Sequence, residues 1–275
     1  MMSNLFSFLT FFFTLCLFFQ GNAQGYYPMG SRAQSLGNAS NTLEDVWAYH
    51  HNPAALTGVK KMEIGICYEN RFLLKELQSQ GAAMALPLKK GVLSVGGQRF
   101  GYRNFISFKT GIGYSMKLSE FLSAGVQLNY AGVRLSDGYG SHGTVTAELG
   151  LLAKINDKWK IGFSIFNLGR NKLADYQEDR YTTVMRLGTS YKISPKVLLL
   201  AEAEKNVDYN LRGKIGLEYS VVSNFFIRGG FATEPIEVSF GMGYQFKKFL
   251  KLDVGSCYHQ VLGWSPNFSL NYQLQ

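Results

Sequence analysis

Apolar and polar residues alternate along most of the chain between residues 62 and 274. The last segment shows the alternation most clearly, with Phe268, Leu270, Tyr272 and Leu274 in one set of positions and Asn267, Ser269, Asn271 and Gln273 in the other. Successive side chains of a β-strand point to opposite faces, so such a segment has one apolar face and one polar face. The pattern therefore predicts β-strands throughout this part of the chain.

The alternation predicts fourteen strands, joined by connections that alternate between tight turns and longer loops. We expect the strands at about 62–70, 81–88, 92–100, 105–116, 122–133, 145–155, 159–167, 182–191, 197–204, 211–219, 225–231, 238–246, 250–258 and 267–274. The longer loops are 71–80, 135–144, 168–181 and 259–266. Strands of about nine to eleven residues with short periplasmic turns and longer outer loops are typical of transmembrane β-barrels. The predicted fold class is all-β, an antiparallel transmembrane barrel over residues 61–275.

The polar faces of these strands carry charges of both signs. They include Glu63, Lys109, Gln127, Glu148, Lys154, Arg186, Arg212, Lys214, Glu218, Arg228 and Asp253. We expect them to face the lumen and to fill it with internal ion pairs rather than to form an ion-selectivity filter.

The start of the chain indicates export. Residues 5–19 form an apolar run that ends in Gln20-Gly21-Asn22-Ala23, and the first basic residue is Arg32. Residues 1–23 are expected to be a signal peptide cleaved after Ala23. An uncleaved anchor is the alternative, although the run is shorter than the ~18 apolar residues of a spanning helix. Export and strands together favour the outer membrane of a Gram-negative cell over a soluble exported sandwich.

The composition and the net charge limit the classes of partner. The chain has 30 Gly, 16 Tyr and 21 Phe but only 17% charged residues, as an outer-membrane barrel does. Its net charge of +9 is scattered over turns and polar faces instead of forming the stripe that nucleic acid requires. The expected surroundings are outer-membrane lipid and lipopolysaccharide, and nucleic acid is not an expected partner.

Few residues are candidates for disulfide formation, catalysis or metal binding. Two cysteines follow the signal, Cys67 and Cys257, which either remain isolated thiols or pair across the lumen. The four histidines are His50, His51, His142 and His259, and their spacing does not predict a catalytic base or a metal site. We expect no enzymatic activity, no metal and no cofactor.

Residues 24–60 do not alternate and are rich in turn-forming residues. They contain Gly30-Ser31-Arg32-Ala33, then Leu36-Gly37-Asn38-Ala39, then Asp45-Val46-Trp47-Ala48, and finally Asn52-Pro53-Ala54-Ala55-Leu56. This succession before fourteen strands resembles the N-terminal segment of the FadL-like outer-membrane barrels, and within them the PorV and PorQ group of Bacteroidetes. The resemblance implies that residues 24–60, here called the hatch, fold into the lumen with Asn52, Pro53 and Ala54 at a turn.

The resemblance also implies function. A barrel of the PorV and PorQ kind would be an interaction component of type IX secretion or surface attachment, with secretion-machinery proteins as partners. The loop expected to touch such a partner carries Arg170, Lys172, Asp175, Tyr176, Glu178, Asp179 and Arg180. The alternative is a FadL-type passive transporter of a hydrophobic ligand, with an apolar cavity near Trp47, Tyr49 and Phe100 and a lateral-gate bulge at Gly96 and Gly97.

Overall fold

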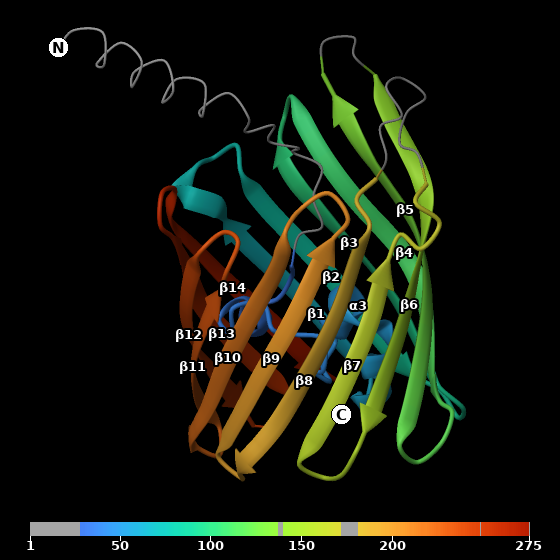
Figure 1. Cartoon of the computed structure of the whole chain (residues 1–275), viewed down its shortest axis with the longest axis vertical. Helices are drawn as coiled ribbons and strands as arrows, with labels where there is room; N and C mark the ends of the chain where they lie inside the picture. The colour runs from blue at the N-terminus through green and yellow to red at the C-terminus, as the bar shows by residue number, and fades with distance from the viewer. Residues whose placement is uncertain (1–27, 137–139, 172–180, 248, 275) are drawn as a thin grey trace, which may run out of the picture.

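The computed structural model describes residues 28–136, 140–171, 181–247 and 249–274, and its fourteen strands form one closed antiparallel barrel (Figure 1). The strands are β1 (Glu63–Asn70), β2 (Gln78–Pro87), β3 (Val92–Tyr102), β4 (Phe105–Lys117), β5 (Leu122–Leu135), β6 (Ser141–Lys154), β7 (Trp159–Phe166), β8 (Val184–Ser194), β9 (Val197–Asn206), β10 (Leu211–Val222), β11 (Phe225–Ala232), β12 (Glu237–Phe246), β13 (Leu250–His259) and β14 (Gly263–Gln273). The predicted fold class and strand number are confirmed. The expected signal peptide, residues 1–23, lies outside the described residues.

Each strand pairs with the next, and the first strand closes the barrel against the last. Glu63 of β1 lies opposite Gln273 of β14, and Glu69 lies opposite Asn267. The connections at the lower end in Figure 1, where β14 also ends, are all short, whereas the upper end has both short turns and the longer connections. Short turns mark the periplasmic end of such barrels, so the upper end is the outer one and β1 runs outward.

The outer wall of the barrel is apolar. Ile112, Leu128 and Met242 are each more than half exposed, and they belong to a band of large apolar side chains that runs around the wall. Exposed apolar surface of this extent is unfavourable in water but favourable against lipid. Among the described helices, none is long and apolar enough to span a membrane.

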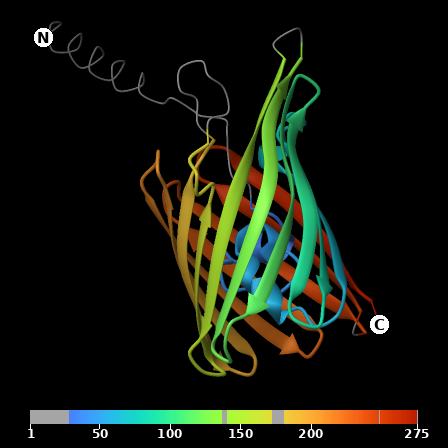
Figure 2. The same ribbon diagram turned by 90° about the vertical axis from the view of Figure 1, so that its right-hand side faces the viewer.

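The helical segments are short. The helices α2 (Ser31–Gln34) and α3 (Ala48–His51) and the 3₁₀-helix η2 (Pro53–Gly58) precede the first strand, and the 3₁₀-helix η3 (Arg71–Leu73) follows it at the outer end. Figure 2 shows the first three of these elements, in blue, inside the barrel.

The predicted strand limits were wrong mainly at the outer end. β14 begins at Gly263 instead of residue 267, so the expected loop 259–266 is a tight turn in which Gly263 has a φ of 86°. Pro266 interrupts the apolar pattern there, yet it lies in the ladder opposite Ser256. β6 similarly begins at Ser141, four residues before the predicted start.

Candidate functional site

The described part of the hatch, residues 28–60, lies inside the barrel and bonds to its wall on all sides. Trp47 Nε1 donates to Asn271 Oδ1 of β14 over 2.8 Å, and Tyr49 Oη donates to the Gly96 carbonyl of β3 over 2.9 Å. Both rings are at most 1% exposed. Polar as well as apolar side chains of the hatch can be buried here, because the lumen wall is itself polar and supplies hydrogen-bond partners.

Asn52 organises the turn between α3 and η2. Its Oδ1 accepts from the Ala54 amide over 3.1 Å, and its Nδ2 donates to the carbonyls of Asn41 and Leu151 over 2.9 and 3.0 Å. The carbonyl of Pro53 accepts from Ser115 Oγ over 2.5 Å. The Asn-Pro-Ala segment therefore caps a short helix and attaches it to β4 and β6 at once.

A carboxylate on the wall holds the backbone of the hatch. Glu202 of β9 accepts from the amides of Ser40 and Asn41 through Oε2, over 2.9 and 2.8 Å. Its Oε1 accepts from Lys214 Nζ of β10 over 2.9 Å. Glu202 and Lys214 are both at most 5% exposed, so this pair is desolvated and satisfied by the hatch.

Ion pairs fill the lumen, as predicted. Arg228 bonds Glu218 over 2.6 Å and Asp253 over 2.7 Å, and Lys109 bonds Glu148 over 2.9 Å. Lys154 is the exception, because it lies at the periplasmic end of β6, half exposed, and pairs with Asp157.

Arg32 of the hatch joins this network of charges. Arg32 reaches Glu218 of β10 over 2.6 Å and Asp45 of the hatch over 3.1 Å. Burial alone would lower the pKa of Arg32, but the carboxylates of Glu218 and Asp45 raise it above its ordinary value. The guanidinium is therefore a permanent positive charge that joins the hatch to the wall.

Burial suppresses protonation of the two hatch histidines. Desolvation and the charge of Arg186 lower the pKa of His51 to about 3. Desolvation and the charge of Lys109 lower the pKa of His50 well below its ordinary value. Desolvation also raises the pKa of Tyr49. All three side chains are neutral at physiological pH, as their enclosed position requires.

A cavity of about 430 Å³ lies between the hatch and the outer loops. One part of its lining is apolar and comes from Pro28, Phe72, Leu77, Phe100, Pro235 and Leu262. The facing part carries arginine and glutamate side chains, and these pair with one another, Arg212 with Glu237 and Arg186 with Glu204. The cavity can hold a small apolar molecule against rings and the flat faces of paired guanidinium groups.

The apolar cavity was expected near Trp47, Tyr49 and Phe100, and this is correct only for Phe100. Trp47 lies against Gly30 and Gly65, and Tyr49 lies against Gly96, so both rings occupy the space beside the wall. Glycine at these positions lets the rings reach the backbone of the strands. The cavity lies farther out, beyond the hatch.

The bulge expected at Gly96 and Gly97 is absent, because β3 is a regular strand at this point. Both ladders of β3 run in register through this point, with Gly96 opposite Ala83 and Gly111. A Cβ atom on Gly96 would lie 2.7 Å from the Tyr49 ring and from the Ala82 carbonyl. The first glycine of the pair therefore makes room for the hatch within a regular strand.

The predicted partner loop is described only in part. Arg170 lies at its start in the left-handed region, with a φ of 48°, and its amide donates to the Asn167 carbonyl over 3.0 Å. The other residues of that prediction lie outside the described residues, namely Lys172, Asp175, Tyr176, Glu178, Asp179 and Arg180. The loop consequently remains a prediction.

The remaining candidates are the two cysteines and the possible metal ligands. Cys67 and Cys257 are free thiols, and Cys67 Sγ lies 3.5 Å from Met29 Sδ of the hatch. Within the described residues, histidine, cysteine and carboxylate side chains do not gather into a group of three that could hold a metal ion. The sequence analysis missed the roles of Arg32 and Glu202, although Arg32 stood inside a quoted motif as a lone charge among small residues.

Comparison with solved structures finds outer-membrane barrels of the same architecture. The monoaromatic hydrocarbon channel CymD is 13% identical with a TM-score of 0.72, over 92% of this chain and 99% of that chain. The toluene transporter TbuX of Ralstonia pickettii is 12% identical with a TM-score of 0.66, over 92% and 100%. A FadL homologue from Pseudomonas aeruginosa is 11% identical with a TM-score of 0.62, over 90% and 98%. Searches against family models and curated proteins gave no match.

The chain therefore has the fold of the FadL-type outer-membrane barrels. Two of these solved structures are a monoaromatic hydrocarbon channel and a toluene transporter. The shared fold and the apolar outer wall support a location in the outer membrane.

Proposed function

We propose that this barrel is a passive channel through which small hydrophobic molecules cross the outer membrane, with the outer cavity as their first binding site. The observation that carries the proposal is the apolar lining from Phe72, Leu77, Phe100 and Leu262 directly above the hatch. The fold supports it, because barrels of this architecture include monoaromatic hydrocarbon channels and toluene transporters. A cavity of about 430 Å³ suits a molecule of that size.

Uptake of N-phenylnaphthylamine by cells tests the proposal. This apolar probe becomes fluorescent once it passes the outer leaflet, so expression of the barrel should raise its rate of entry several-fold. The double variant Leu77→Trp with Leu262→Trp adds two rings to the cavity and should return the rate to background. The matched control is Leu88→Trp with Leu118→Trp, at exposed positions of the periplasmic turns, which should keep the rate.

Two results would overturn the proposal. One is an uptake rate that expression does not change. The other is equal loss of uptake in both double variants at equal amounts of folded barrel in the membrane.

An interaction barrel of the PorV and PorQ kind is the second candidate. The observation that favours it is the filling of the inner lumen by Trp47, Tyr49 and the Arg228 ion pairs. The test is mild-detergent purification of the tagged protein from its own outer membrane, followed by mass spectrometry. Stoichiometric secretion-machinery proteins, lost on deletion of residues 171–178, would support this candidate. A lone barrel that carries apolar small molecules would support the channel.

A further inference from the structure

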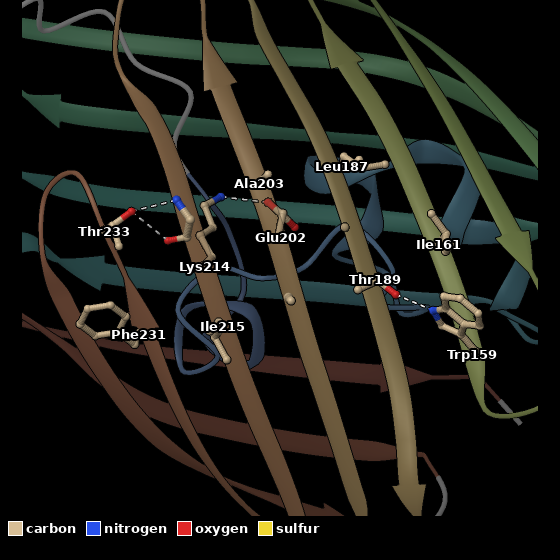
Figure 3. A pocket seen from close by; sticks show the side chains of 13 residues that line it. Trp159, Ile161, Leu187, Thr189, Glu202, Ala203, Lys214, Ile215, Phe231 and Thr233 are labelled. Carbon is tan, nitrogen blue, oxygen red and sulfur yellow. Dashed lines mark hydrogen bonds and ion pairs between the residues drawn. The ribbon is translucent and has the colours of Figure 1, made fainter.

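The outer wall of the barrel has an apolar hollow of about 610 Å³ within the lipid-facing band (Figure 3). Its floor consists of small side chains on three neighbouring strands, namely Thr189 of β8, Ala201 and Ala203 of β9, and Gly213 of β10. Bulky side chains flank this floor, among them Leu187 on one side and Phe231 on the other. The hollow is thus a groove set into the wall.

The strand register explains why the groove exists. Ala201 lies beside Thr189, and Ala203 lies between Leu187 and Gly213. Neighbouring strands are about 4.8 Å apart, so small residues on adjacent strands leave a trough about as wide as one hydrocarbon chain. Side chains flank the trough on both sides, and it opens toward the lipid.

The periplasmic end of the groove carries an aromatic anchor and positive charge. Trp159, at the start of β7, donates from Nε1 to Thr189 Oγ1 over 2.8 Å, as Figure 3 shows. Lys158 precedes it, and the Lys192 amide donates to the Lys158 carbonyl over 2.8 Å. Lys158 and Lys196, in the turns before β7 and β9, are exposed at the level where tryptophan marks the membrane interface, whereas Lys192 lies on the lumen-facing side of β8.

Among the described residues, most of the exposed lysines lie at this end. Exposed lysines recur in the short turns and at the strand ends beside them, as at Lys89, Lys90, Lys117, Lys158, Lys192 and Lys196. The described outer end carries charges of both signs, and some of them pair, as Arg71 with Glu69 and Arg212 with Glu237. The positive charge therefore faces the phospholipid headgroups of the periplasmic leaflet, whereas the sequence had suggested lipopolysaccharide.

We propose that the groove binds one acyl chain of an anionic phospholipid of the periplasmic leaflet, with the headgroup held by Lys158 and Lys196. Six positions separate Val197, next to Lys196, from Ala203 along β9, which corresponds to about 20 Å of strand and, at the ~40° tilt of such strands, to about 15 Å along the membrane normal. That length matches the depth of one leaflet, about half of a ~30 Å hydrocarbon core. A second copy of the barrel is disfavoured as the occupant, because a symmetric contact would bring the same lysines together.

Native mass spectrometry of the purified full-length barrel tests this site. The detergent-solubilised protein is incubated with phosphatidylglycerol or with phosphatidylcholine of the same chains. We expect one phosphatidylglycerol to stay bound at collision energies that remove phosphatidylcholine. Ala201→Phe, which fills the trough, and the double variant Lys158→Gln, Lys196→Gln should each reduce the retained fraction at least fivefold.

Matched controls lie on other parts of the wall. Ala124→Phe places the same ring on the lipid-facing side of β5, and the double variant Lys89→Gln, Lys90→Gln removes the same charge from another turn. Both should retain phosphatidylglycerol as the parent does. Equal loss in the controls, equal retention of the two lipids, or a dimer that Ala201→Phe dissociates would each overturn the proposal. Lipid retention is measured without probe uptake through the lumen, so the lipid site and the proposed channel are tested independently.

Discussion

Asn52 connects three backbone groups inside the lumen, and its removal should weaken the barrel measurably. Asn52→Ala leaves the Ala54 amide and the carbonyls of Asn41 and Leu151 without this side chain. A buried polar group that loses its hydrogen-bond partner lowers the free energy of unfolding by about 1–3 kcal/mol. Because the structure can relax around the site, we expect the variant to lose about 2–4 kcal/mol in total.

Urea unfolding in lipid vesicles, followed by the gel shift of the folded barrel, measures this loss. Asn156→Ala is the matched control, because the Asn156 side chain accepts hydrogen bonds from two backbone amides in an exposed turn. It should cost no more than about 1 kcal/mol. Equal losses in the two variants would contradict the role assigned to Asn52.

The two hatch histidines should make the hatch sensitive to acid. Both are neutral in the folded protein, with the pKa of His51 lowered to about 3, whereas an unfolded histidine titrates near 6.5. The stability that this provides is complete above pH 6.5 and is lost as the pH falls toward 3; for His51 the loss is about 2 kcal/mol at pH 5.

Trp47 fluorescence reports this loss when Trp159 and Trp264 are replaced by Phe. We expect Trp47 emission to shift to longer wavelength as the pH falls from 6.5 to 4. Replacement of His50 and His51 by Gln should flatten this pH dependence, while other titrating groups act equally in both proteins. An unchanged pH dependence would exclude the histidines as its cause.

The sequence could reveal individual residues of the hatch only where they formed a local motif. Asn52-Pro53 stood out because both residues favour turns through their own chemistry. The bond between Arg32 and Glu218 could not be found in this way, since 186 positions separate the two residues. Its geometry depends on how the barrel closes around the hatch.

At the level of the strand, β3 should respond differently to two adjacent substitutions. Gly96→Ala places a methyl group 2.7 Å from the Tyr49 ring, and we expect it to destabilise the hatch by about 1–3 kcal/mol. Gly97→Ala points to the lipid side, where its nearest contact is 3.2 Å from the Lys109 carbonyl, and it should cost less than about 1 kcal/mol.

Protease accessibility of the hatch and urea unfolding distinguish the two variants. A larger effect at Gly97 than at Gly96 would restore the idea of an opening in β3. The probe-uptake rate of Gly97→Ala should equal that of the parent, because passage does not use this part of the wall.

The strands could be predicted because lipid on one side and a polar lumen on the other impose a period of two. Prediction failed where that contrast weakens, beyond the membrane. Pro266 and the glycine-rich start of β6 suggested loops, although the ladders continue through both. The short helices of the hatch were not predicted at all, because helices of four residues carry no periodic pattern.

At the level of the whole molecule, the number of strands and the turn pattern were sufficient to predict closure, and the charged polar faces predicted the ion pairs of the lumen, but the position of the remaining free space could not be predicted. The hatch fills the inner lumen, and the apolar cavity lies outside it. A molecule that enters this cavity from the outer end must therefore displace part of the hatch to continue. Transport should depend on hatch movement, whereas binding in the cavity should not.

A reversible tether between hatch and wall separates these two steps. Met29 Sδ lies 3.5 Å from Cys67 Sγ of β1, so Met29→Cys places a second thiol beside a natural one. Joining them by oxidation or with a short bis-thiosulfonate should reduce N-phenylnaphthylamine uptake at least fivefold, and dithiothreitol should restore it. Binding of the probe to the purified protein should stay unchanged. The parent, treated in the same way, keeps Cys67 and Cys257 unlinked and should lose no uptake. Full uptake through a barrel shown by mass spectrometry to be tethered would mean that the ligand leaves the cavity by a route that bypasses the hatch.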